Sequence, residues 1–351
     1  MTMMDMKQPL VKVEGLKVHF NLNEGLVRAI EDVSFEIERG KTLGVVGESG
    51  CGKSVTSQAI MQMVPPPGKI VSGQITFYRY PADRAPEAID ITSLKPDSDA
   101  ICHIRGNEIA KIFQEPMTSL SPVHTIGTQI GEAIQLHQKV DKAEARQRTI
   151  EILRHVGFPQ PEQRVDAYPH QLSGGLRQRA MIAMALSCHP SLLIADEPTT
   201  ALDVTTEAQI LQLMKSLQAD LGMAILFITH NLGVIAKMAD DVVVMYLGKD
   251  VEYASVDDIF YDPYHPYTHA LLRSIPYLGH KSGEKLYTIA GSIADPYNIP
   301  KGCPFHPRCP EFMPGVCDRD QPVPITPIKP GHSVRCWLYV DSKEKSEEHH
   351  A

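Results

Sequence analysis

Residues 47–54 limit what this chain can fold into more than any other part of the sequence. They read G-E-S-G-C-G-K-S, which has the spacing G-x-x-x-x-G-K-S. The apolar run at 42–46 has the character of a buried strand, and helical spacing over 54–64 follows the motif until three consecutive prolines stop it. A glycine-rich loop between a strand and a helix lets backbone N–H groups surround an anion. The motif therefore predicts a phosphate-binding loop in an α/β protein, and a chance glycine turn is the less favoured alternative.

The side chains of this loop have defined tasks in such a site. Lys53 would neutralise the β- and γ-phosphate oxygens, and the Ser54 hydroxyl is placed for Mg²⁺. Cys51 fills a variable position, where no particular side chain is needed. The residues expected to contact the nucleotide are Gly47, Ser49, Gly50, Cys51, Gly52, Lys53, Ser54 and Val55.

A second anion-binding element lies far downstream, where Ser173, Gly174 and Gly175 open a helical segment. A serine hydroxyl and free N–H groups at a helix N-terminus offer donors and roughly half a positive charge to an anion. One nucleotide does not need two such elements from a single subunit. Two subunits placed head to tail do, because each offers its loop to one nucleotide and its Ser-Gly-Gly turn to the other. An ordinary N-cap is the alternative, and for this turn taken alone it is the better one.

Two adjacent carboxylates, Asp196 and Glu197, follow an apolar strand at 191–195. Because side chains alternate along a strand, the two acids are expected to have different tasks. We expect Asp196 to hold hydrated Mg²⁺ and Glu197 to polarise the water that attacks the γ-phosphate. Without a phosphate loop in the same chain, a pair of exposed acids before a turn would be the default interpretation.

His230 and Gln114 complete the candidate site. His230 follows an apolar strand at 224–229, and open α/β sheets bind ligands at the carboxyl ends of their strands. We assign it to the γ-phosphate, although a lone histidine at a strand end is more often structural. Gln114 lies where the sheet leads into a helical block, so we expect it to sense Mg²⁺ and water, with a solvated loop glutamine as the alternative.

Length and composition exclude several classes of protein. With 351 residues the chain has room for one large core and an appendage, or for two modest domains. A net charge of −8 argues against nonspecific nucleic-acid binding, which favours a basic surface. The first ten residues lack an apolar core, and no window approaches the roughly 20 apolar residues of a membrane span. We therefore expect a cytosolic protein that can dock onto a membrane protein.

The other segments complete an α/β organisation. Alternation over 10–37 predicts antiparallel strands, and 242–246 predicts a further strand. The stretch 80–100 is polar and contains prolines, so we interpret it as a surface excursion. From about 261 prolines and cysteines become frequent, which places a domain boundary near 260, and the charged tail after 340 is expected to be disordered. Helical spacing occurs at 128–138, at 142–156 and after Gly174.

Together these residues resemble the ATP-binding cassette (ABC) ATPases. Phe20 lies where that family places an aromatic side chain that stacks on adenine, although a core phenylalanine is equally plausible. Leu176 departs from the family pattern, in which many members have Gln, but the phosphate donors precede it. The matching segments are 47–54 (Walker A), Gln114 (Q-loop), 172–175 (signature), 192–197 (Walker B), 201–203 (D-loop) and His230 (switch histidine).

The resemblance covers about 11–259 and implies a P-loop NTPase fold. That fold combines a RecA-like core with an antiparallel β subdomain and a helical subdomain, here at about 115–188. It implies a nucleotide-binding cassette at 1–260, with ATP and Mg²⁺ as cofactors. The remainder, 261–351, would be a small Cys/Pro-rich C-terminal extension.

Further segments, at 114–120, 168–175, 265–268 and 302–310, are similar to the oligopeptide/dipeptide importer ATPases. That resemblance implies one of two ATPase subunits, identical or different, at the cytoplasmic face of the membrane. It would lie beneath two permeases fed by an extracytoplasmic binding protein. Related ATPases serve nickel, oligosaccharides or opines, which are alternative cargoes. A soluble ABC ATPase of DNA maintenance or translation is the alternative outside transport, but those typically have a coiled-coil insertion or a second cassette.

Four of the seven cysteines follow residue 300. Disulfides are not expected in a reducing compartment. Four thiolates suit zinc or a [4Fe–4S] cluster, and the gaps here lack the C-x₂-C pairs of common zinc ribbons. Some members of the resembled subfamily are thought to carry the cluster, which makes it the preferred hypothesis, with no metal and zinc as alternatives. The candidate ligands are Cys303, Cys309, Cys317 and Cys336, whereas Cys102 and Cys188 are isolated and are expected to be structural.

Overall fold

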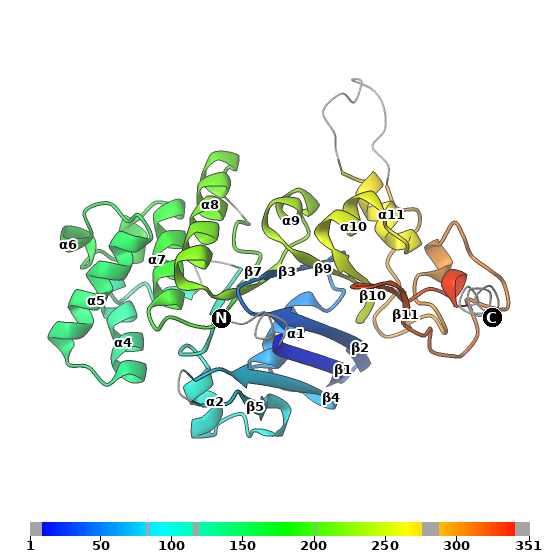
Figure 1. The fold of residues 1–351 in the computed structure, drawn as a ribbon, viewed down its shortest axis with the longest axis horizontal. Helices are drawn as coiled ribbons and strands as arrows, with labels where there is room; N and C mark the ends of the chain where they lie inside the picture. The colour runs from blue at the N-terminus through cyan, green and yellow to red at the C-terminus, as the bar shows by residue number, and fades with distance from the viewer. Residues whose placement is uncertain (1–8, 82–83, 115–118, 201, 276–287, 341–351) are drawn as a thin grey trace. The chain divides into compact units, whose positions relative to one another are not determined.

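The computed structural model describes residues 9–81, 84–114, 119–200, 202–275 and 288–340 (Figure 1). The chain divides into two compact units, each assembled from separate stretches of sequence. The first comprises Met1–Val11, Glu36–Thr42 and Thr76–Ile228, and the second comprises Lys12–Phe35, Leu43–Ile75 and Thr229–Ala351. In the described ranges, the structure contains no helix with the length and apolar character that a membrane span requires.

Parallel strands β6 (Ile109–Ile112), β7 (Leu192–Asp196) and β8 (Ala224–Ile228) form a sheet in the first unit. β7 lies in the middle, with Ala195 opposite Ile112 on one side and opposite Phe227 on the other. Every residue of β7 and β8 is buried, as expected for the continuous apolar runs of a parallel sheet. Because the strands are parallel, the segments that follow β6 and β7 start at the same edge of the sheet.

Helices follow the predicted periodicity closely in the first unit. The segments expected at 128–138 and 142–156 form α4 (Ile126–Gln138) and α5 (Lys142–His155). Their N-termini are capped by Thr125 and Asp141, which accept the N–H groups of Thr128 and Glu144. Figure 1 shows these helices gathered with α6 (Pro161–Arg164) beside α7 (Gly174–Leu186). A longer helix, α8 (Val204–Leu221), follows β7.

The stretch 80–100 contains more structure than the predicted surface excursion. β5 (Glu87–Asp90) pairs antiparallel with the end of β4 (Gly68–Arg79), with Thr76 opposite Asp90. Asp90 then caps a 3₁₀ turn, η2 (Ile91–Ser93), whose Ile91 is fully buried, and α2 (Asp99–Ile104) follows. A strand of four residues is too short for its alternation to stand out in the sequence.

The second unit contains a mixed sheet. The predicted strands at 10–37 are β1 (Pro9–Leu22) and β2 (Gly25–Glu38), which are neighbours in that sheet. β3 (Thr42–Val46) is buried throughout and pairs parallel with β9 (Asp241–Tyr246), which pairs antiparallel with β10 (Lys249–Ser255). Both β3 and β9 were expected from the sequence. β3 leads directly into the glycine-rich loop.

Helix α1 (Lys53–Ile60) follows that loop but ends before the residue predicted from its periodicity, Val64. Gln62 has φ 54, and the Met63 N–H donates to the Gln58 carbonyl oxygen at 2.7 Å. This left-handed turn ends the helix before the prolines are reached. The short helices α9 (Leu232–Met238), α10 (Val256–Tyr261) and α11 (Pro266–Arg273) complete the helices described in this unit.

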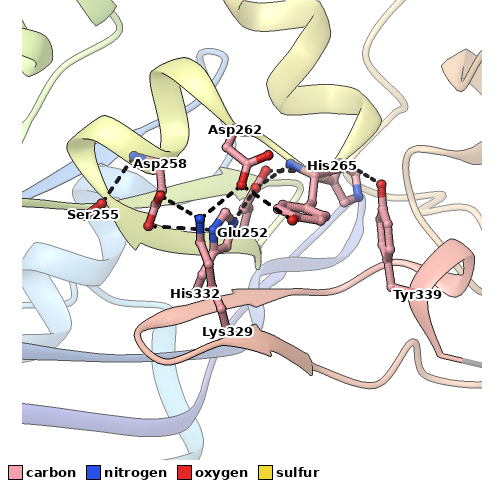
Figure 2. Close-up of polar contacts among 9 residues, drawn as sticks. Glu252, Ser255, Asp258, Asp262, His265, Lys329, His332 and Tyr339 are labelled. Atoms are coloured by element: carbon pink, nitrogen blue, oxygen red, sulfur yellow. Dashed lines mark hydrogen bonds and ion pairs between the residues drawn. The ribbon is translucent and has the colours of Figure 1, made fainter. Parts of the chain in front are cut away.

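The C-terminal residues belong to the second unit. A hairpin of β11 (Thr326–Lys329) and β12 (His332–Val334) adds to its sheet, because β12 pairs antiparallel with β10. Lys329 and His332 reach from this hairpin to Asp258 and Glu252 (Figure 2). The 3₁₀ turns η4 (His306–Arg308) and η5 (Trp337–Tyr339) flank the hairpin in sequence. The tail after 340, predicted to be disordered, lies outside the described residues.

Candidate functional site

The phosphate loop forms a tight turn that its glycines make possible. Gly47 has φ 151, and a Cβ there would lie 2.2 Å from the Met245 carbonyl oxygen. Gly52 is the left-handed N-cap of α1, with φ 104, and a Cβ there would lie 2.6 Å from the Ala29 carbonyl oxygen. Side chains are therefore excluded at both positions.

Lys53 begins α1, and its side chain folds back over the loop. The ammonium group donates to the carbonyl oxygens of Gly47 at 2.7 Å and Glu48 at 3.0 Å, and the residue is only 6% exposed. Its charge is thus held among the backbone groups that would surround a phosphate. Ser54 is half-buried at the next position, and Ser49 and Gly50 lie exposed on the loop.

Residues outside the motif hold the loop in place, and sequence reasoning missed them. The Glu48 N–H donates to the Tyr267 hydroxyl oxygen at 2.8 Å, and the Glu48 carboxylate pairs with Arg308. Glu48 occupies a variable position of the motif, so no local signal pointed to these contacts. All three residues belong to the second unit.

Asp196 lies at the carboxyl end of β7 and is paired with a lysine that the sequence analysis did not single out. Lys111 Nζ lies 2.9 Å from Asp196 Oδ2, and both side chains are almost fully buried. The pairing fixes a carboxylate at the end of the strand. The signal was visible in the sequence, because Lys111 is a charged residue within the otherwise apolar run Ile109–Ile112.

Glu197 and Gln114, both predicted site residues, are in contact. Gln114 Nε2 donates to Glu197 Oε2 at 3.0 Å, and the Thr200 hydroxyl donates to the same oxygen at 3.1 Å. The two acids diverge for a reason other than strand alternation: β7 ends at Asp196, and Glu197 has a left-handed backbone with φ 47. Glu197 is half-buried, so its carboxylate is positioned by two donors while remaining accessible to water.

The Ser-Gly-Gly turn begins α7, as predicted. Ser173 is its N-cap and accepts the Leu176 N–H at 3.4 Å, and Ser173 and Gly174 are both exposed. A Cβ at Gly175 would lie 2.9 Å from Thr206 Cγ2, so the glycine allows α7 and α8 to approach closely. Asp203, in the predicted D-loop, caps α8. Ala201 of that loop and 115–118 of the segment 114–120 lie outside the described residues.

Phe20 and His230 belong to the second unit, with the phosphate loop. Phe20 lies half-buried on β1, and a Cβ at Gly68 would lie 2.5 Å from its Cε1 atom, so the ring packs against the chain there. β8 ends at Ile228, and His230 is exposed just before Asn231 caps α9. Gln114, Asp196, Glu197 and Ser173–Gly175 belong to the first unit.

The four C-terminal cysteines line one narrow cavity, which Phe305 and Trp337 also line. Burial raises the pKa of Cys303 to about 11 and the pKa of Cys336 to about 12, so both thiols are protonated at neutral pH. Among the described residues, no group of three or more His, Cys, Asp or Glu side chains is arranged to hold a metal ion. The cysteines are Cys303, Cys309, Cys317 and Cys336.

The two isolated cysteines differ in their surroundings. Cys188 is buried, as a structural cysteine would be. Cys102 is exposed on α2, which differs from the buried position expected of a structural cysteine.

Two family models and several known proteins are similar to this chain. Residues 30–200 match the family model described as ABC transporter, and residues 251–317 match the model described as Oligopeptide/dipeptide transporter, C-terminal region. The Oligopeptide transport ATP-binding protein AppD of Bacillus subtilis is 51% identical over 331 residues, which cover 94% of this chain and 97% of AppD. The Dipeptide transport ATP-binding protein DppD of the same organism is 47% identical, over 94% of this chain and 95% of DppD.

A solved structure shares the fold. The ATP-binding cassette MJ0796, determined as a dimer bound to ADP and phosphate, has a TM-score of 0.59 and 26% identity. The similarity covers 70% of this chain and 98% of the MJ0796 chain.

Proposed function

This chain belongs to the oligopeptide/dipeptide branch of the ATP-binding proteins of ABC transporters. From that premise we propose how its residues bind and hydrolyse ATP. It is the ATPase subunit of a peptide ABC importer, which hydrolyses ATP to ADP and phosphate. The observation that carries this conclusion is the 51% sequence identity to the Oligopeptide transport ATP-binding protein AppD, over 97% of the length of AppD.

ATP would bind at the phosphate loop. Lys53 would neutralise phosphate oxygens, Phe20 would stack on adenine and His230 would contact the γ-phosphate. Mg²⁺ takes oxygen ligands, and the Ser54 hydroxyl, the Gln114 amide and the Asp196 carboxylate are donors of that kind. These side chains would hold the ion, which shields the phosphate charge. The fixed position of Asp196 beside Lys111 supports its part in this proposal.

Glu197 would polarise the attacking water. Its carboxylate is held by Gln114 and Thr200, which limits the positions that its second oxygen can take. A carboxylate oriented in this way can accept a hydrogen bond, and then a proton, from a water aligned with the γ-phosphate. Gln114 would sense whether that water is present, because its side chain contacts Glu197.

A second ATPase subunit, identical or different, would complete each nucleotide site. The turn at Ser173, Gly174 and Gly175 would contact the nucleotide held by the partner's phosphate loop. Support comes from its exposure at the start of α7 and from the dimeric state of the similar cassette MJ0796. Closure of such a dimer would be driven by ATP and reversed by hydrolysis.

The remaining organisation follows the same proposal. Residues 1–260 would form the cassette, with its helical subdomain at about 115–188, and 261–351 the C-terminal extension. The subunit would bind peripherally to two permeases at the cytoplasmic face of the membrane. An extracytoplasmic binding protein would deliver di- or oligopeptides to them.

The four C-terminal cysteines would ligate a [4Fe–4S] cluster. Their number, their chemistry and their shared cavity support this, but their present arrangement does not match a metal site, so the thiols would have to move together and lose protons. Iron and acid-labile sulfide should be measured in protein purified anaerobically, with Cys309→Ser as the comparison. Colourless, iron-free protein would contradict the cluster.

The proposed ATPase site is tested by Lys53→Ala. Removing the ammonium group should abolish ATP binding, measured by equilibrium titration with a fluorescent ATP analogue. Lys142→Ala, which removes an exposed lysine at the start of α5, is the matched control and should bind normally. Full ATP affinity in Lys53→Ala would overturn the assignment of the loop.

A further inference from the structure

Glu48, the second residue of the phosphate loop, is held from outside the loop through its backbone. Its N–H donates to the hydroxyl oxygen of Tyr267 at 2.8 Å. Tyr267 lies on α11 and is fully buried, and burial raises the pKa of its hydroxyl. A neutral, buried hydroxyl therefore fixes the backbone of the loop at this residue.

The side chain of Glu48 is held by Arg308. Two parallel contacts join the guanidinium to the carboxylate, Nη1 to Oε2 at 2.7 Å and Nη2 to Oε1 at 3.0 Å. The Arg308 side chain is 5% exposed, and its Nε donates to the Ala290 carbonyl oxygen at 3.0 Å. A bidentate pair with a third fixed nitrogen leaves the guanidinium little freedom to reorient.

Aromatic packing supports both contacts. The ring of Phe305 lies 5.2 Å from that of Tyr246 and 5.3 Å from that of Tyr267, and these two tyrosine rings are 4.7 Å apart. Phe305 is three residues before Arg308 and is buried, as are both tyrosines. The chain around η4 is therefore packed against the residues that contact the loop.

The contacts of Glu48 extend to the lysine that would meet the phosphates. Lys53 Nζ donates to the Glu48 carbonyl oxygen, so a shift of the Glu48 backbone moves one of the acceptors that position the ammonium group. Glu48 also places a negative charge inside a loop whose task is to attract anions. Unless that charge is paired, it opposes the binding of phosphate groups.

We propose that Arg308 and Tyr267 are positioning residues for the nucleotide. Arg308 neutralises and orients Glu48, and Tyr267 fixes its backbone, so residues far beyond the motif complete the phosphate loop. The C-terminal residues therefore position the phosphate loop through Arg308, in addition to extending the sheet through β11 and β12. This inference rests on the proposed function, because it requires that the loop bind ATP.

The test compares single and double variants at the Glu48–Arg308 pair. Arg308→Ala leaves Glu48 unpaired and should raise the KM for ATP about 10- to 100-fold, the effect expected when a charge-assisted hydrogen bond is lost, with kcat at saturating ATP changed much less. Adding Glu48→Gln to Arg308→Ala removes the unpaired charge and should recover most of the affinity. A purely structural role of Arg308 predicts no such recovery.

Arg146→Ala is the matched control. Arg146 also forms a bidentate pair, with both nitrogens 2.7 Å from the Asp166 carboxylate, but this pair is exposed on the helical block. Its loss should leave the KM unchanged. Affinity is measured on the isolated subunit with a fluorescent ATP analogue, KM and kcat on the complete transporter, and folding by thermal unfolding without nucleotide.

If Arg308→Ala does not fold, Arg308→Lys and Tyr267→Phe replace it in the test. Arg308→Lys removes the bidentate contact with Glu48, and Tyr267→Phe removes the hydroxyl that accepts the Glu48 N–H. Wild-type KM in folded Arg308 variants would overturn the positioning assignment while leaving the ATPase intact. A wild-type chain that binds no ATP would overturn the proposed function, and the positioning assignment with it. The two failures are therefore distinguishable.

Discussion

Glu252 Oε1 and His332 Nε2 lie 2.8 Å apart in a hydrogen bond, and neither side chain is exposed. The pair joins β10 to β12, at the point where the C-terminal hairpin adds to the sheet (Figure 2). Glu252 also accepts the N–H groups of Tyr264 at 2.7 Å and His265 at 3.0 Å. The Glu252 carboxylate thus connects β10 to the chain at Tyr264 and His265 and to β12.

Replacing that carboxylate should destabilise the protein strongly. Each carboxylate oxygen of Glu252 accepts one backbone N–H group, and Gln has only one carbonyl oxygen, so Glu252→Gln leaves a buried donor without its acceptor, which costs about 1–3 kcal/mol. The free energy of unfolding, measured by denaturant titration at neutral pH, checks this. Lys329→Ala is the control from the same hairpin: it removes contacts to Asp258 and Asp262 at a partly exposed site and should have little effect. Equal stability of Glu252→Gln and wild type would contradict the prediction.

Two acids on β10 should give opposite pH dependences of stability. Burial raises the pKa of Glu252, but hydrogen bonds from His332 and its other donors outweigh this, and the pKa lies below its ordinary 4.5. Its stabilising contribution is therefore complete above pH 4.5 and is lost as the pH falls through the folded pKa. Burial raises the pKa of Asp250 from 3.8 to about 6, although Arg335 opposes this from 2.9 Å. Its contribution is present at low pH and is lost as the pH rises through about 6.

Asp250→Asn isolates this second effect. The variant should show a flatter dependence of unfolding free energy on pH between 3.8 and about 6 than wild type. Asp320→Asn, which changes an exposed acid paired with Lys301, should retain the wild-type slope. An unchanged slope in Asp250→Asn would show that Arg335 keeps Asp250 charged throughout this range.

Local patterns were sufficient to predict much of the site. The glycine spacing anticipated the turns at Gly47 and Gly52, where side chains do not fit. Gln114 and Glu197 were each predicted as site residues from their positions after the sheet and after a buried strand, and the structure shows them in contact. Both features depend on short stretches of chain, whose patterns a sequence displays directly.

Contacts between distant segments could not be predicted in this way. Arg308 lies 260 residues from Glu48, and Glu48 occupies a variable position of the motif. β5 was missed because four residues carry too little periodicity, and the divergence of Asp196 and Glu197 depends on a backbone turn rather than on strand alternation. Such features arise from tertiary packing, which local patterns do not encode.

Glu197→Gln should separate ATP binding from hydrolysis. The amide keeps the shape of the side chain but cannot act as a base, a loss that typically costs about 10²–10⁴-fold in rate. Phosphate release by the complete transporter should fall by that amount, while a fluorescent ATP analogue binds as before. Glu151→Gln, which changes an exposed acid on α5, should hydrolyse normally. Undiminished turnover in Glu197→Gln would refute the assigned task.

Ser173→Glu tests whether the Ser-Gly-Gly turn acts on a partner's nucleotide. The turn is exposed, and a carboxylate there would meet the terminal phosphate of ATP bound by the partner, where like charges repel by several kcal/mol. In a Glu197→Gln background, ATP should dimerise the parent protein but not the variant, as measured by light scattering. Binding of ATP to the monomer should be unchanged, because the phosphate loop is intact. Ser173→Thr retains the hydroxyl and should dimerise, whereas ATP-driven dimers of Ser173→Glu would show that the turn is only the N-cap of α7.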